Sequence, residues 1–408
     1  MIVRLRDEKL KNILVYILLF FAAMNFQTRF SLFLLLAFAG VCFLQKSLKI
    51  NELIFVYLLL SFLMFIYNSD KGVLSVIHFA APTCSYLIGL NITSENAYKN
   101  NTDSMMLTSQ KNGYVLLAII SLGSFAHFLL NFITNVGSSV GRNTNDIWTG
   151  TTMAATGQAA LACLMLGFAV AMIFLPSTKE RRVIGMLCVL LIMAYNLILS
   201  GRTLIIMLLV LCFVALMYPK FKDVTKSYKN KYYISMCGIF VAMIVIYVAD
   251  IGGIRTYINN SLLFERFEDM SGAFVDNSAR TNTKILFIKD ALNHPFGGLY
   301  MRHKYGYAHD LLLDGYDEYG FLGLLLLLTI VFDGAIQLYR IVFKSTLNNE
   351  IKLVFLLVNI AVWLEFTVEP ILAGMSWLFS CYCLINGCMS GMNRTVLLTQ
   401  QISSENKG

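Results

Sequence analysis

The chain has 408 residues, of which 57% are hydrophobic and only 14% are charged, and its formal net charge is +8. So small a charged share excludes a water-soluble globular protein, because soluble domains carry about 25% charged residues. We therefore expect the lipid bilayer to be the main solvent of the chain, and the placement of its positive charges matters more than their sum.

Apolar runs alternate with short polar segments along the whole sequence. Because backbone groups in lipid must be hydrogen-bonded internally, each run predicts a membrane-spanning helix of about 20 residues. The runs fall at residues 12–28, 30–45, 51–68, 72–90, 113–133, 152–175, 183–200, 203–218, 232–250, 319–342, 352–368 and 371–391. No small-residue cleavage site follows the first run, so we expect Ile13 to Phe26 to be a retained helix. The prediction is one all-α polytopic membrane domain over residues 1–408.

The distribution of Lys and Arg predicts which side of the membrane each loop faces. With the N-terminus in the cytoplasm, the segments predicted to face the cytoplasm contain 21 of the 32 Lys and Arg residues. Short cytoplasmic loops of membrane proteins are enriched in these two residue types. We therefore expect both termini in the cytoplasm. The large loop at 250–319, between the ninth and tenth helices, is then on the opposite side.

The large loop has a predicted helix of its own. From Thr281 to Asn293, the apolar residues Ile285, Ile288 and Leu292 recur at helical spacing and are interleaved with lysines. This pattern predicts an amphipathic helix lying at the membrane interface. A proline at position 295 and the two glycines after it end the helix.

Three arginines on the predicted exterior side are candidate anion contacts. Arg202 lies in the very short turn Ser200-Gly201-Arg202-Thr203 and is either a snorkelling membrane anchor or a contact to something anionic. Arg280 starts the amphipathic helix, and Arg142 lies in the loop from 134 to 150; each is either a solvated loop residue or a second cationic contact. Because planar guanidinium donors meet oxygens in pairs, two arginines suit a diphosphate without a metal.

A histidine and several carboxylates complete the candidate site. His309 is either structural, able to accept a proton from a sugar hydroxyl when neutral, or able to orient a phosphate when charged, and it lies near Asp310 and Glu318. Glu365 and Glu369 lie near the exterior end of the eleventh predicted span, where a carboxylate normally faces a polar interior. Each of these four carboxylates is a possible base or orienting group, and Glu365 or Glu369 is alternatively the partner of an arginine.

Several common chemistries lack their motifs in this sequence. There is no phosphate-binding Gly-rich loop with Lys, no metal-binding histidine pair and no Gly-x-Ser-x-Gly sequence. All nine cysteines lie in apolar runs, so their pattern predicts neither a disulfide framework nor a zinc site. We therefore expect no metal and no cofactor, and no nucleic-acid partner.

Three pieces of the sequence, within roughly residues 195–330, resemble the O-antigen ligase and O-antigen polymerase superfamily of bacterial envelope polysaccharide synthesis. They are Leu199-Ser200-Gly201-Arg202; Ser278-Ala279-Arg280 followed by His294-Pro295-Phe296-Gly297-Gly298; and Ala308-His309-Asp310 followed by Glu318-Tyr319-Gly320-Phe321-Leu322-Gly323. The resemblance implies a GT-C-like membrane glycosyltransferase in which Arg202 and Arg280 grip the diphosphate of the donor and His309 lies on the acceptor side. Ligases commonly have His-Asn where this chain has His309-Asp310.

This resemblance implies an inner-membrane enzyme whose active site faces the periplasm. The first interpretation is a polymerase, which transfers a growing glycan from undecaprenyl diphosphate to the non-reducing sugar of another lipid-linked repeat unit, without metal and with inversion. Membrane lipid and a chain-length regulator protein are further implied partners. The alternatives are a ligase that transfers the glycan to lipid A-core, and a lipid-linked oligosaccharide flippase or other transporter.

Overall fold

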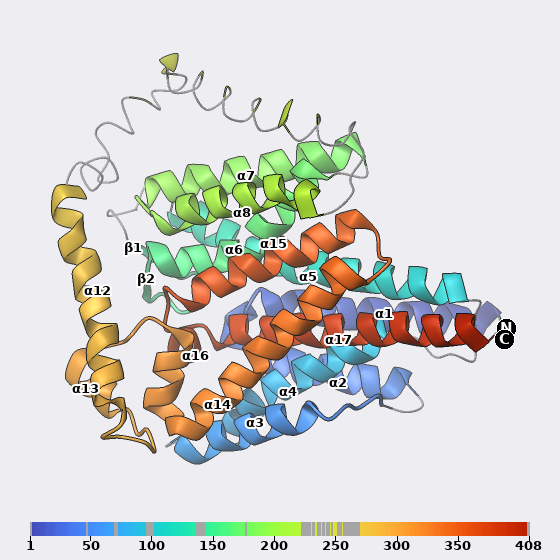
Figure 1. Ribbon diagram of the computed structural model, residues 1–408, viewed down its shortest axis with the longest axis horizontal. Coiled ribbons are helices and arrows are strands. Elements are labelled where there is room, and N and C mark those ends of the chain that lie inside the picture. Colours follow the sequence, from blue (N-terminus) through green and yellow to red (C-terminus); the bar gives the residue numbers. More distant parts are fainter. Residues whose placement is uncertain are drawn as a thin grey trace. The chain divides into compact units, whose positions relative to one another are not determined.

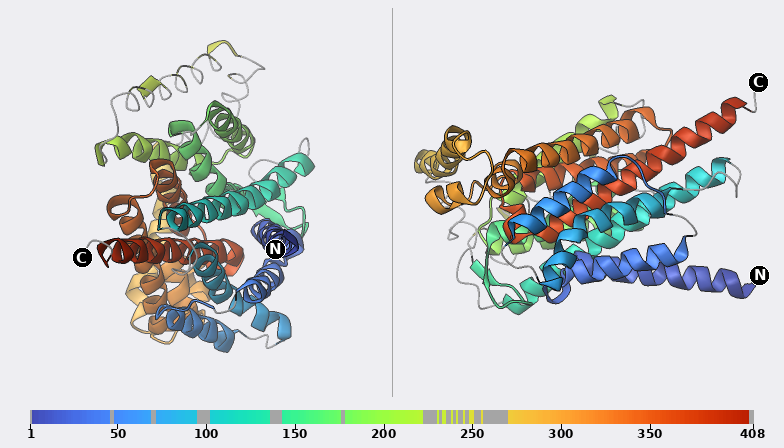
Figure 2. Two further views of the ribbon diagram at one scale, coloured as in Figure 1. Left: turned by 90° about the vertical axis from the view of Figure 1, so that its right-hand side faces the viewer. Right: turned by 90° about the horizontal axis from the view of Figure 1, so that it is seen from below.

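The computed structural model describes residues 2–45, 48–68, 72–94, 102–135, 143–175, 178–221, scattered positions between 230 and 255, and 270–405. Regular structure in this part of the chain is almost entirely helical, as Figures 1 and 2 show. The chain divides into two compact units, which are described one at a time. Unit 1 comprises Met1–His127, Thr283–Lys352 and Glu369–Gly408, and unit 2 comprises Phe128–Asn282 and Leu353–Val368.

The regular structure in the described residues of unit 1 is helical. Its elements are α1 (Ile2–Ala23), η1 (Phe26–Thr28), α2 (Phe30–Leu44), α3 (Ile54–Tyr67), α4 (Val73–Thr93), most of α5 (Thr102–Asn135), the end of α12 (Met270–Ala291), α13 (Tyr300–Tyr305), α14 (Leu311–Tyr339), η3 (Arg340–Lys344), α16 (Ile371–Gly374) and α17 (Ser376–Glu405).

Unit 2 combines helices with one short hairpin. Its elements are the end of α5, β1 (Asn143–Asn145), β2 (Thr152–Ala154), α6 (Ala155–Phe174), α7 (Lys179–Ile198), α8 (Thr203–Phe221), the first part of α12, and most of α15 (Asn349–Phe366). Strands β1 and β2 are antiparallel, with Thr144 opposite Met153.

Helices α4 and α17 make the most extensive helix contact among the described elements of unit 1 (Figure 1), and small residues line this contact. A methyl group at Gly387 of α17 would overlap the backbone of Tyr86 on α4. A methyl group at Gly89 of α4 would overlap the backbone of α17 at Leu384. Apolar side chains gain little from leaving lipid for one another, so close backbone approach at small residues drives such helices together. The sequence Gly387-x-x-x-Gly391 therefore fixes how α17 packs.

The protein is an all-α membrane protein. Five of the described helices are long and apolar enough to cross a bilayer: Val73–Thr93, Ser104–Asn135, Ala155–Phe174, Lys179–Ile198 and Leu311–Lys344. Shorter apolar helices accompany them at Ile13–Ala23, Phe30–Leu44, Ile54–Tyr67 and Thr203–Tyr218.

A helix occupies each predicted span except the one at 232–250, most of which lies outside the described residues. Several predicted boundaries were wrong. Helix α1 begins at Ile2 and ends at Ala23, and α5 begins eleven residues before the predicted start, at Thr102. The last predicted run, 371–391, is two helices, because the chain leaves helical angles at Met375 before α17 begins.

The predicted helix from Thr281 to Asn293 is the last part of α12, which begins earlier, at Met270. Its predicted apolar residues Ile285, Ile288 and Leu292 are exposed. The residue of this stretch that packs inward is Phe287, which is fully buried in a cluster with Met301, Ala308 and Tyr316. The inward-packing residue thus lies among the predicted apolar residues, whose exposure leaves the predicted interfacial location of this helix a prediction.

Candidate functional site

The loop after α12 and the middle of α14 interlock in unit 1. Helix α14 is interrupted at Gly320, whose φ of 68° lies in the left-handed region. At this interruption the Phe321 amide donates to the Pro295 carbonyl at 2.8 Å, and the Leu299 amide donates to the Asp317 carbonyl at 2.9 Å. A methyl group at Gly320 would overlap the Pro295 carbonyl oxygen. Two pieces of sequence about 20 residues apart therefore form one local structure, and the glycines permit their close approach.

Asp317 positions the short helix α13. Its carboxylate, which is 1% exposed, accepts hydrogen bonds from the backbone amides of Met301 at 2.8 Å and Arg302 at 3.0 Å. The first amides of a helix have no partner within the helix, and an acceptor carboxylate there is stabilising. Asp317 thereby fixes the position from which the Arg302 side chain projects.

The guanidinium of Arg302 is held on three sides. Its Nη2 donates to Glu318 Oε2 at 3.3 Å, its Nε lies 4.0 Å from Asp317 Oδ2, and its carbon Cζ lies 4.6 Å from the centre of the Tyr307 ring. The side chain is 15% exposed. An ion pair combined with a cation–π contact suits arginine better than lysine, because the guanidinium is planar.

Glu318 is held by a second donor as well. The Tyr319 hydroxyl donates to Glu318 Oε1 at 2.7 Å, while the other oxygen, Oε2, faces Arg302. Each carboxylate oxygen accepts more than one hydrogen bond, so acceptor capacity remains for a ligand. The Glu318 side chain is 25% exposed and can be reached from outside.

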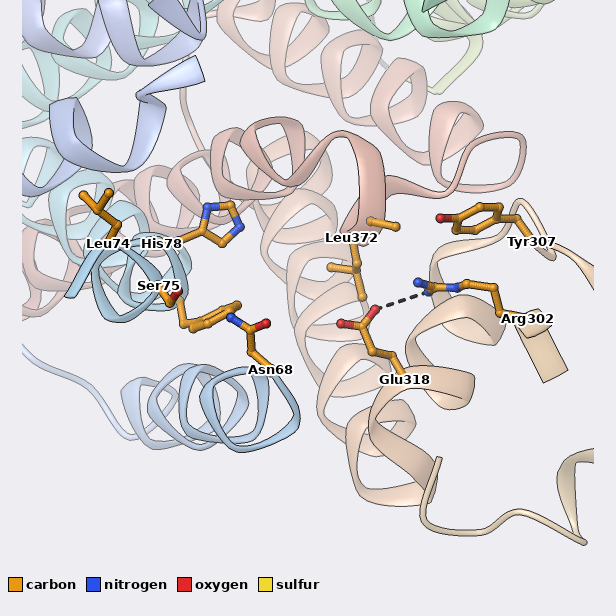
Figure 3. A pocket seen from close by; sticks show the side chains of 10 residues that line it. Asn68, Leu74, Ser75, His78, Arg302, Tyr307, Glu318 and Leu372 are labelled. Atoms are coloured by element: carbon orange, nitrogen blue, oxygen red, sulfur yellow. Dashed lines mark hydrogen bonds and ion pairs between the residues drawn. The ribbon is translucent and has the colours of Figure 1, made fainter. Parts of the chain in front are cut away.

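Arg302, Tyr307 and Glu318 form one wall of a cavity of about 490 Å³ in unit 1. In Figure 3 the opposite wall carries His78, Ser75 and Asn68, from α4 and the end of α3. The His78 ring is edge-on to the Phe30 ring, at a centroid distance of 5.2 Å, which restricts its orientation. A volume in this range and a few converging polar groups are typical of small-molecule sites.

His309, a predicted catalytic residue, has a constrained backbone. Its φ is 54°, in the left-handed region that residues other than glycine seldom adopt. The amides on either side of it, of Ala308 and Asp310, donate to the two carboxylate oxygens of Asp314 at 3.0 and 3.1 Å. Asp314, which is 1% exposed, therefore maintains the turn that presents the histidine. The His309 ring centre lies 6.3 Å from that of Tyr307.

Asp310 is occupied by structural contacts. Its Oδ1 accepts hydrogen bonds from the amides of Leu312 and Leu313 at the start of α14, at 3.1 and 3.3 Å. Its Oδ2 accepts from Lys284 at 3.2 Å. An aspartate at this position stabilises a helix N-terminus. Of the two roles predicted for Asp310, these contacts favour an orienting carboxylate over a base.

The end of α12 is fastened to α13 by polar contacts at Asp290. Asn293 donates to Asp290 Oδ1 at 2.8 Å, and Lys304 and Tyr305 donate to Oδ2 at 3.2 and 3.1 Å. These hydrogen bonds, chiefly those from Asn293 and Lys304, lower the pKa of Asp290 to about 2. The carboxylate is therefore ionised throughout the physiological range, and this connection persists there.

Arg202 lies in unit 2, at the start of α8, and is half-buried. The turn before it is tight: Ser200 has a φ of 51°, and the Asn196 side-chain amide donates to the Gly201 carbonyl at 2.7 Å. A methyl group at Gly201 would overlap the Asn196 side-chain oxygen. The guanidinium thus adds its charge to the positive end of a helix, an arrangement that favours an anion.

The remaining predicted residues are distributed over both units. Arg280 is exposed on α12 in unit 2. Glu365 is buried on α15 in unit 2, and Glu369 is buried before α16 in unit 1. Arg142 lies outside the described residues. His309, Asp310 and Glu318 lie together in the α13–α14 segment of unit 1.

Reasoning from the sequence missed Arg302, His78 and the positioning role of two aspartates. Arg302 was not among the candidate residues, and no role was predicted for it. His78 lies in an apolar run and gave no signal. Asp314 and Asp317 were visible in the sequence as acidic residues near His309. Their closeness in the chain to this histidine and to the segment that forms α13 was the available indication of their positioning roles.

In the part of the chain that the structure describes, no group of three His, Cys, Asp or Glu side chains is arranged to hold a metal ion.

No protein-family model matches the chain, and no curated protein matches it in sequence. The proposed function therefore depends on the residues and on their geometry within each unit.

Proposed function

We propose that the protein is a glycosyltransferase that polymerises an envelope polysaccharide from undecaprenyl-diphosphate-linked repeat units. The growing glycan moves from its lipid carrier to the non-reducing sugar of another lipid-linked unit. The proposal includes a GT-C-like arrangement of about a dozen spans in the bacterial inner membrane, with both termini in the cytoplasm and the site facing the periplasm.

One observation carries this proposal: the polar cavity of unit 1 lies at the ends of apolar helices. Its lining side chains come from the end of α3, the start of α4, the short helix α16 and the interlocked α13–α14 segment. A substrate with a polyprenyl tail and a sugar head needs a polar site of this kind next to lipid. The loop that forms the interlock contains the same residues on which the resemblance to O-antigen polymerases depends.

The proposed reaction is a single displacement at the anomeric carbon. The acceptor hydroxyl oxygen forms a bond to that carbon, the bond from carbon to the diphosphate oxygen breaks, and undecaprenyl diphosphate leaves with the electron pair. The hydroxyl proton passes to the imidazole of His309. Arg202 and Arg280 stabilise the charge that develops on the diphosphate. Direct displacement inverts the configuration of the sugar.

The proposal is tested with purified protein and a synthetic undecaprenyl-diphosphate-linked repeat unit in EDTA, with the products resolved by gel or mass spectrometry. A ladder of multimers is expected from the natural sequence and a loss of about 100-fold or more from His309→Ala, by analogy with other general bases. Arg202→Ala and Arg280→Ala are expected to lose the ladder, while Arg394→Ala, an exposed arginine on α17, retains it.

Two other outcomes identify the alternatives. Single units that persist until lipid A-core is added, and are then transferred to it, make the protein a ligase. Transport of labelled lipid-linked sugar across vesicle membranes, without any new glycosidic bond, makes it a flippase and removes the polymerase proposal.

A further inference from the structure

The cavity in unit 1 has a chemical character that narrows what can bind in it. Its walls combine a carboxylate, an imidazole, an amide, a hydroxyl and the aromatic ring of Tyr307, with Leu74 and Leu372 as apolar patches. Each hydroxyl of a sugar both donates and accepts hydrogen bonds, and a mixture of donor and acceptor groups matches this requirement. The apolar patches suit the C–H faces of a sugar ring.

The charge balance of the cavity disfavours an anionic ligand. Its one arginine, Arg302, already faces two carboxylates, those of Glu318 at 3.3 Å and Asp317 at 4.0 Å. Glu318 lines the cavity and Asp317 lies behind Arg302, so the positive charge of this arginine is already compensated and none is left over to attract an anion. A diphosphate or a uronate brought here would meet uncompensated repulsion, whereas an uncharged or ammonium-bearing sugar would not.

Glu318 is fixed in position by contacts on both of its oxygens. Tyr319 holds one oxygen at 2.7 Å and Arg302 holds the other, and the Arg302 backbone is in turn fixed by Asp317 at 3.0 Å. A carboxylate that is held in place and keeps spare lone pairs orients a hydroxyl or ammonium group with little further loss of conformational entropy.

We infer that this cavity is the acceptor-sugar subsite, that it takes a sugar without an anionic group, and that Glu318 accepts a hydrogen bond from that sugar. Arg302 is a positioning residue for Glu318. The assignment of the sugar as an acceptor depends on the proposed function; the preference for a non-anionic sugar depends on the cavity alone. The donor diphosphate is not expected to bind in this cavity, because the one arginine there already has carboxylate partners.

The binding preference is measured by saturation-transfer NMR on the full-length protein in nanodiscs, without glycoside detergent. The probes are the methyl glycosides of N-acetylglucosamine, glucosamine and glucuronic acid. The first two are expected to bind more tightly than the glucuronide by about tenfold or more, which corresponds to about 1.4 kcal/mol. Equal or tighter binding of the glucuronide overturns the inference.

Matched variants test whether the side chains of the cavity cause this preference. Glu318→Gln keeps the size of the side chain, and we expect it to reduce the ratio between glucosamine and glucuronide affinity about tenfold. Asp290→Asn makes the same chemical change outside the cavity and is expected to retain the ratio. Ala373→Trp, which adds bulk at an exposed lining position, weakens binding of every probe. If Glu318→Gln unfolds at the same temperature as the natural sequence and its ratio of glucosamine to glucuronide affinity is unchanged, the inference is contradicted.

Kinetics separates the inference from the proposed function. In a polymerisation assay with acceptor and donor concentrations varied independently, Glu318→Gln and Arg302→Lys are expected to raise the KM for the acceptor and to leave the KM for the donor unchanged. If the natural sequence makes no polymer but shows the sugar preference, the proposed function is wrong and the sugar site stands. If polymer forms and both variants keep their acceptor KM, the function stands and the subsite assignment is wrong.

Discussion

Four carboxylates follow His309 closely, and their side chains differ in what they contact. Asp310 and Asp317 accept hydrogen bonds from the first amides of α14 and α13, and Asp314 accepts from the amides that flank His309. Only Glu318, among these four, lines the cavity. Three of the acidic residues therefore determine the local backbone, and the fourth is available to a ligand.

The left-handed backbone of His309 allows the role of its imidazole to be separated from its role in folding. His309→Asn and His309→Ala both remove the ring, but asparagine adopts left-handed angles more readily than alanine does. We expect both variants to lose polymerisation. His309→Ala should also be less stable than His309→Asn by about 1 kcal/mol, because the left-handed conformation costs alanine 1–2 kcal/mol.

This comparison is made by thermal unfolding in detergent alongside the polymerisation assay. Equal stabilities of the two variants would contradict the assigned backbone strain. Full activity of His309→Asn would remove the imidazole from the reaction and leave His309 a structural residue.

At the scale of elements, the interlock between the loop after α12 and the interruption of α14 determines the geometry of the cavity wall. Gly297 and Gly298 are neighbours in this loop, with φ of 76° and 98°. A methyl group at Gly297 would meet the backbone of Glu318 and Gly320, whereas one at Gly298 would meet nothing within 4 Å. Alanine substitutions at these two glycines therefore distinguish the cost of steric overlap from the cost of conformational strain.

Gly297→Ala is expected to destabilise the protein more than Gly298→Ala, although both substitutions place alanine at a positive φ. Gly298→Ala incurs the conformational cost of about 1–2 kcal/mol, and Gly297→Ala adds the overlap, which must push α14 away from the loop. Chemical unfolding measured by fluorescence gives the two free energies. Similar losses in both variants would show that the loop and α14 are not tightly interlocked.

The sequence predicted the helices better than the contacts between them. Hydropathy located the apolar helices, since burial in lipid depends on composition, and the proline and glycines after Asn293 correctly marked the end of α12. The sequence did not reveal that α14 begins at Leu311 and is interrupted at Gly320, because the predicted apolar run began only at residue 319, after the acidic residues. Nor did it reveal Arg302 in the cavity, because only tertiary packing places its guanidinium against Tyr307 and Glu318.

At the scale of the whole molecule, helix packing and membrane orientation have different physical causes. The small residues Gly387 and Gly391 let α17 approach α4, and this contact is a property of unit 1 alone. Orientation depends instead on charge: the segments that are rich in Lys and Arg are expected to stay in the cytoplasm. The proposed enzyme requires that the α13–α14 segment be on the opposite side, where lipid-linked repeat units are polymerised.

Cysteine labelling tests this orientation at two exposed positions, one near the cavity and one near the C-terminus. Lys304→Cys lies on α13 and Ser404→Cys lies at the end of α17. The described native cysteines are buried or half-buried, so they contribute little background. We expect a membrane-impermeant thiol reagent to label Lys304→Cys on intact spheroplasts. Ser404→Cys should be labelled only after the membrane is permeabilised. The reverse pattern would place the cavity in the cytoplasm, where sugars are available on nucleotide carriers, and would rule out the proposed polymerase without affecting the fold of unit 1.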